Sequence, residues 1–146
     1  MQYHYYLGSD QGPSLFLMSL ATRRHSFAQF MICASGCCCG RVDKGKPAVP
    51  VAWLKQEWRA RRLNPRVQLT IAECLGPCDL VNVVAVFGPG DPIWLGGMTE
   101  EAPFRTLLHW AAESHLAGTL LPFPAELEPY QFARFLSSPL QQERSS

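Results

Sequence analysis

Hydrophobic and polar positions alternate in short segments along this chain, and two of those segments end at cysteines. Residues 27–32 form a short apolar run, which predicts a buried strand that ends at Cys33. Residues 66–72 place apolar side chains at every second position, which predicts another strand that leads directly to Cys74. Both cysteine-bearing segments are therefore expected to begin where a strand ends.

A third run, residues 81–87, is almost continuously apolar, as expected for a central strand buried on both faces. The Gly-Pro-Gly-Asp-Pro sequence at 88–92 predicts a turn. Residues 93–95 predict a short strand that pairs antiparallel with the preceding one.

Two segments have helical periodicity. The first is expected to begin at Pro50 and to end near Leu63, with an arginine cluster in its last turn. The second is expected to be capped by Thr99 and to end before Gly118. The resulting order of strand, helix, three strands and helix predicts an α/β fold in which helices flank a small mixed sheet.

The length of 146 residues suits one domain of ordinary size. We expect an irregular N-terminal extension over residues 1–25, a folded domain over 26–118 and a C-terminal extension over 119–146. Within this last part, residues 125–136 are expected to form a short amphipathic helix.

Composition narrows the function further. The formal net charge is only +1, which argues against a generic nucleic-acid binder. No apolar run has the roughly 18 residues that a membrane-spanning helix needs. Without a recognisable signal peptide, the chain is expected to be cytoplasmic, where clustered cysteines favour metal binding over disulfide formation.

All six cysteines lie in two short stretches, 33–39 and 74–78, and this segregation predicts a single site. Four thiolates that converge from two loops are typical of a zinc site or of a two-iron cluster. In the second stretch, Gly76 and Pro77 favour a tight non-helical loop in which both sulfurs point the same way. In the first stretch, three adjacent cysteines compete for the remaining ligand positions.

The spacing resembles that of the thioredoxin-like two-iron two-sulfur ferredoxins, a family that includes the small flavin-partner subunit of respiratory complex I. Cys33 and Cys38 have four residues between them, then thirty-five residues lead to Cys74, and three separate it from Cys78. The second loop also has the family's Cys-Leu-Gly-x-Cys sequence. The resemblance covers about residues 27–117, and the chain departs from it at Asn82, where many relatives carry proline.

This resemblance implies a thioredoxin-like fold and a [2Fe-2S] cluster held by Cys33, Cys38, Cys74 and Cys78, with Cys37 or Cys39 as competitors for the second position. It also implies a ferredoxin that carries single electrons, often as a homodimer, or that serves as a subunit of a larger redox or cofactor-building enzyme. No catalytic constellation accompanies the cysteines, so we expect an electron-transfer protein without an enzymatic activity of its own.

Two other functions fit the same cysteines. A structural zinc module for protein binding would use four thiolates, although paired zinc cysteines more often have two residues between them. A thiol-based redox or metal-transfer protein would use the spare Cys37 and Cys39. Arg41, Lys44 and Lys46 lie just after the first stretch. In an electron carrier they would either attract an acidic redox partner, offset the negative charge of a four-thiolate cluster or simply be solvated, and the sequence favours none of the three.

Overall fold

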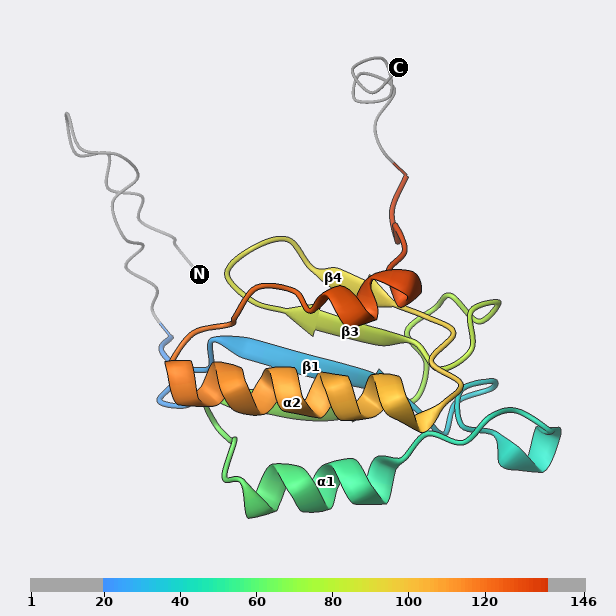
Figure 1. Cartoon of the computed structure of the whole chain (residues 1–146), viewed down its shortest axis with the longest axis horizontal. Coiled ribbons are helices and arrows are strands. Elements are labelled where there is room, and N and C mark those ends of the chain that lie inside the picture. The colour runs from blue at the N-terminus through green and yellow to red at the C-terminus, as the bar shows by residue number, and fades with distance from the viewer. Residues whose placement is uncertain (1–19, 137–146) are drawn as a thin grey trace.

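The computed structural model describes residues 20–136 of the chain (Figure 1). These residues form four strands, two α-helices and two short 3-10 helices. In chain order the elements are β1 (Ala28–Cys33), η1 (Val42–Lys44), α1 (Val51–Ala60), β2 (Val67–Ala72), β3 (Val84–Phe87), β4 (Ile93–Leu95), α2 (Glu101–Ala117) and η2 (Ala125–Tyr130).

The strands form one mixed sheet in the order β2, β1, β3, β4. β1 pairs parallel with β2, while β3 is antiparallel to both β1 and β4. A parallel pair joined through a helix, followed by an antiparallel pair and a second helix, is the thioredoxin-like arrangement. The expected α/β class and the small mixed sheet with flanking helices are therefore confirmed.

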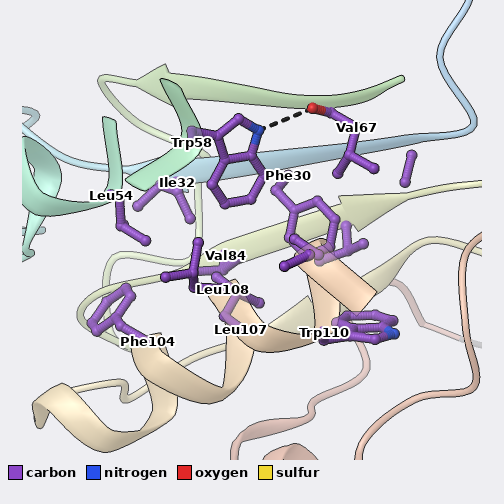
Figure 2. Close-up of a cluster of buried hydrophobic side chains, with 14 of the residues drawn as sticks. Phe30, Ile32, Leu54, Trp58, Val67, Val84, Phe104, Leu107, Leu108 and Trp110 are labelled. Carbon is purple, nitrogen blue, oxygen red and sulfur yellow. Dashed lines mark hydrogen bonds between the residues drawn. The ribbon is translucent and has the colours of Figure 1, made fainter. Parts of the chain in front are cut away.

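Both helices pack against the same face of the sheet, and Phe30 lies between them (Figure 2). Its ring makes edge contacts with Trp58 of α1 at 5.5 Å and with Trp110 of α2 at 5.3 Å between centroids. The indole N–H of Trp58 donates to the backbone oxygen of Val67 at 2.9 Å, which ties α1 to the start of β2 (Figure 2). These large aromatic side chains join the two helices and the sheet into one core.

The C-terminal segment closes the β4 edge of the sheet (Figure 1). The N–H of Phe132 donates to the oxygen of Trp94 at 3.0 Å, and Leu95 forms a bridge with Gln131. Leu127 of η2 is fully buried in the main core. Residues 125–132 thus extend the sheet and the core of the domain that precedes them.

Several expected boundaries differ in the structure. α1 ends at Ala60, because Arg62 adopts a left-handed φ of 52° and sends Leu63 into the core beyond the helix. β3 begins only at Val84, because Asn82 also has a left-handed φ, of 57°, which interrupts an extended strand.

Thr99 does not cap α2, whose N-cap is Glu100 and has no side-chain capping bond. The short helix expected over 125–136 is a 3-10 helix confined to Ala125–Tyr130, η2, and Gln131 and Phe132 are extended beside β4. The division into 1–25, 26–118 and 119–146 stays a prediction, and most of the N-terminal part lies outside the described residues. No helix in the described range combines the length and hydrophobicity that crossing a membrane requires.

Candidate metal centre

Both cysteine loops leave the same end of the sheet (Figure 1). β1 and β2 are parallel neighbours, and their last residues, Cys33 and Ala72, are directly paired. Because parallel strands end at the same edge, the loops that follow them must begin side by side. The hydrogen bond from the N–H of Ala34 to the oxygen of Ala72, at 2.7 Å, continues the pairing beyond the strand ends.

The two loops touch through their backbones at Gly36. A Cβ atom at Gly36 would lie 1.8 Å from the carbonyl oxygen of Glu73, so only glycine fits there. The thiol of Cys33 donates to the same oxygen at 3.4 Å. The absence of a side chain at Gly36 therefore lets one loop cross the other.

Cys78 lies at the centre of a group of thiols on the surface. Its Sγ is 3.6 Å from the Sγ of Cys37 and 3.6 Å from that of Cys74. The sulfurs of Cys37, Cys38 and Cys78 all lie within 4.8 Å of one another. Two thiolates bound about 2.3 Å from one tetrahedral metal would be about 3.8 Å apart, so the donor set and its spacing fit a metal bound by thiolates.

The remaining cysteines form an inner layer beneath this group. Cys38 and Cys39 are buried with their sulfurs 3.8 Å apart, and Cys33 is 2% exposed. Burial, together with a hydrogen bond from its own thiol to Cys39, raises the pKa of Cys33 to about 12. All six thiols are free, and those of Cys37, Cys74 and Cys78 are exposed.

The pKa of Cys78 is raised as well, here because neighbouring thiols share hydrogen bonds with it. Cys74, Cys37 and Cys38 contribute in that order, ahead of a smaller effect of burial. A thiolate at this position would be repelled by the neighbouring sulfurs wherever these are also deprotonated. A bound cation would relieve that repulsion, because coordination favours the deprotonated form of a thiol.

The structure thus gathers the cysteines that the sequence singled out, although not all of them equally closely. Cys38 and Cys78 belong to the compact group, and Cys74 contacts Cys78 directly. Cys33 belongs to the inner layer, and Cys37 takes the exposed position beside Cys78. The expected ligand set of Cys33, Cys38, Cys74 and Cys78, with Cys37 or Cys39 as competitors for the position of Cys38, stays a prediction.

Asn82 is a residue of the site whose role could not be found from the sequence. Its side chain is completely buried, and its Oδ1 accepts a hydrogen bond from the N–H of Gly40 at 3.0 Å. Its Nδ2 donates to the oxygen of Met98 at 3.0 Å and lies 3.4 Å from the oxygens of Pro47 and Ala48. Asn82 therefore joins the loops after both cysteine stretches to the turn that precedes α2.

Arg134 is a second residue that sequence patterns did not indicate, because the contact depends on the course of the C-terminal segment. Its Nη2 lies 2.7 Å from the position a Cβ atom would take at Gly76, inside the Cys74 to Cys78 loop. The guanidinium also lies over the rings of Trp94, at 5.6 Å, and Phe135, at 5.4 Å. Its buried Nε has no hydrogen-bond partner among the described residues.

The basic residues after the first stretch behave differently from one another. Arg41 forms an ion pair with Asp43, at 2.6 Å, and donates to the oxygen of Gly36 at 2.8 Å. The bond from Arg41 lowers the pKa of Asp43 to about 2. Lys44 and Lys46 are exposed. Arg41 therefore braces the first loop, while the two lysines face solvent.

Comparisons with known proteins add one structural likeness. No protein-family model matches the chain, and no curated protein matches it. Among solved structures, the thioredoxin-like [2Fe-2S] ferredoxin from Aquifex aeolicus, determined at 1.5 Å resolution, is similar to it with a TM-score of 0.41 and 18% sequence identity. The match covers 75% of this chain and 100% of that one.

Proposed function

We propose that this protein is a small single-electron carrier, or an electron-transfer subunit of a larger enzyme, that holds a [2Fe-2S] cluster between residues 33–39 and 74–78. The observation that carries the proposal is the convergence of thiols from both loops on Cys78, with Cys37 and Cys74 each 3.6 Å away. Thiolate ligands are the donors that iron-sulfur clusters use. When bound, such a cluster accepts and releases one electron at a time.

Three features of the chain suit this role. Exposed thiols at Cys37, Cys74 and Cys78 place the metal centre at the surface, where a partner protein can approach closely. The buried layer of Cys33, Cys38 and Cys39 excludes water from the other side. The sheet and Asn82 hold the two loops in register, so that little rearrangement need accompany electron transfer.

Cys38, Cys74 and Cys78 are the three ligands on which the family spacing and the contacts agree. The family spacing makes Cys33 the fourth, whereas the contact with Cys78 favours Cys37. Single serine substitutions separate the two sets. Loss of the cluster in Cys33→Ser with retention in Cys37→Ser assigns Cys33, and the reverse assigns Cys37. Retention in Cys78→Ser would contradict either set.

Cations near the cysteines favour an acidic redox partner. Arg134 lies against the second loop, and exposed Lys44 and Lys46 follow the first. These charges would offset part of the negative charge of four thiolates, and the lysines would attract an acidic surface toward the metal centre. We propose docking at Lys44 and Lys46, with Arg41 held in place by Asp43 to support their loop.

The test is anaerobic purification of the full chain, followed by iron and acid-labile sulfide analysis, visible absorption and electron paramagnetic resonance of the reduced sample. About two irons and two sulfides per chain, with a rhombic or axial signal on reduction, are expected. Colourless protein without iron and acid-labile sulfide would overturn the proposal.

A mononuclear zinc site is the second candidate, and one observation favours it. The sulfurs of Cys37, Cys38 and Cys78 lie within 4.8 Å of one another, which is closer to the spread of ligands around a single ion than around two. Colourless protein with about one zinc per chain, and loss of fold on chelation, would assign this function instead.

A further inference from the structure

β2 forms an edge of the sheet that no other strand covers. It pairs along its length with β1 on one side, and no strand in the described range lies on its other side. On that side the N–H of Val67 already bonds Leu63 and its oxygen already bonds Trp58, so the backbone groups available to an extended chain are those of β2 beyond Val67. The opposite edge differs, because β4 is bridged to Gln131.

A groove of about 770 Å³ runs between this free edge and α1. The side chain of Trp58, only 2% exposed, forms its floor, and half-buried Leu69 and Ile71 of β2 form one wall. The groove therefore has an apolar base that extended side chains of a partner could cover.

Three exposed cations stand on the rim of this groove, Lys55, Arg59 and Arg62. No acidic residue lines it. None of the three cations takes part in an ion pair with another described residue, whereas the neighbouring Arg61 is paired with Glu57. The rim consequently presents uncompensated positive charge beside free backbone hydrogen-bonding groups.

We propose that this groove binds an extended acidic segment of a partner protein, which adds to β2 as a further strand of the sheet. Backbone hydrogen bonds to the edge would hold the segment, and apolar side chains at every second position would pack on Leu69 and Ile71. Carboxylates between them would pair with Lys55, Arg59 and Arg62. Affinity would then depend on both strand addition and charge.

Other occupants match the groove less well. A second copy of the chain paired edge to edge would bring two sets of the same cations together, and like charges repel. The chain's own terminal segments are poor candidates, since residues 1–19 contain one acidic residue, Asp10, and residues 137–146 contain one, Glu143. A nucleic acid would satisfy the cations but would leave the apolar wall and the strand edge without partners.

The position of the groove links it to the cysteines. β2 ends at Ala72, two residues before Cys74, so a segment held along this strand extends toward the end of the sheet that carries both cysteine loops. If the proposed electron-carrier function holds, a bound partner would be kept beside the metal centre. The binding itself requires no cluster, so the two proposals can fail separately.

The test uses a fluorescein-labelled ten-residue peptide of alternating Glu with Val or Thr, and measures its fluorescence anisotropy with the full chain at low and near-physiological salt. The wild type should bind it more tightly than a matched Lys peptide. Arg59→Glu should weaken binding by roughly tenfold or more, while Arg105→Glu, the same charge change on α2, should leave it nearly unchanged. Equal losses in the two variants would reject the groove as the binding site.

Two further measurements separate strand addition from simple charge attraction. Two versions of the peptide, each N-methylated at one set of alternate residues, should differ in affinity. At least one should lose binding, because methylation removes the backbone N–H groups that would donate to β2. The outward-facing amides of β2 beyond Val67, which are not bonded to β1, should become slower to exchange with solvent when the parent peptide binds. The proposal would be overturned if both methylated peptides bound as well as the parent peptide, or if an oligonucleotide of equal length bound more tightly. It would also be overturned if sedimentation showed that the chain self-associates and that this self-association prevents peptide binding.

Discussion

The α-carbon of Gly36 lies so close to the carbonyl oxygen of Glu73 that a Cβ atom there would be 1.8 Å from it. These residues belong to different cysteine loops that are far apart in the sequence, and the parallel pairing of β1 and β2 brings them together. The separation of the two loops is thus set by a backbone contact.

We expect Gly36→Ala to abolish assembly of the metal centre while leaving the sheet folded. The added methyl group must push the loops apart, because a backbone carbonyl cannot move aside as a flexible side chain can. Iron or zinc bound per chain, together with far-ultraviolet circular dichroism, checks this. Gly90→Ala is the matched control, since nothing lies within 4 Å of a Cβ at Gly90. Full metal content in Gly36→Ala would contradict the prediction.

Asn82→Ala should destabilise the chain by about 1–3 kcal/mol, because its removal leaves the partly buried N–H of Gly40 and the buried oxygen of Met98 without their partner. Denaturant unfolding of the metal-free protein measures the change. Asn82→Gly separates the two contributions of the residue, since glycine adopts the φ of 57° without strain but makes no side-chain bonds. A stability equal to wild type in Asn82→Gly would show that only the backbone conformation matters.

Arg134→Gln should lower the reduction potential of a bound cluster, because a nearby cation stabilises the more negative reduced state. We expect the reduction potential to fall by about 59 mV, which for one electron is a tenfold change in the ratio of reduced to oxidised protein at fixed potential. A redox titration followed by paramagnetic resonance measures it. Arg105→Gln is the control, since Arg105 also lies over a tryptophan, Trp53, at 5.8 Å. Equal potentials in the two variants would remove Arg134 from this role.

The ion pair of Arg41 with Asp43 should be visible as a low carboxyl pKa. The hydrogen bond from Arg41 lowers the pKa of Asp43 to about 2. Because the folded value lies below the ordinary value of about 3.9, the contribution of this pair to stability is present above that pH and is lost as pH falls toward 2. Carbon-detected nuclear magnetic resonance gives the midpoint. Arg41→Gln should return it to near 3.9, and an unchanged midpoint would contradict the assignment.

The part of the fold predicted from sequence is the part that local patterns encode. The strand before Cys33 and the alternating strand before Cys74 are confirmed, and so is the antiparallel partner at 93–95. Since one strand ends at Cys33 and the other ends two residues before Cys74, the meeting of the two loops could also be expected. The helix boundaries could not, because Leu63 is held in the core by tertiary packing and not by a helix.

Contacts between distant segments were beyond the reach of sequence patterns. Asn82 gave no signal other than its place where relatives of the resembled family carry proline, and its four oxygen and nitrogen partners come from three other loops. Arg134 reaches Gly76 only because residues 131–132 lie beside β4 instead of forming a helix. Its position could be known only after that segment was placed.

The bridge between Leu95 and Gln131 has a consequence for how this molecule can associate through its sheet. Within the described residues, one border of the sheet is already occupied by the chain itself, so β2 is left as the single open border. A sheet with one open edge can pair with one other such sheet. The combined sheet then has no open edge left for a further strand. Repeated strand pairing into long fibres is thereby blocked, although β2 can still pair with a strand of one partner.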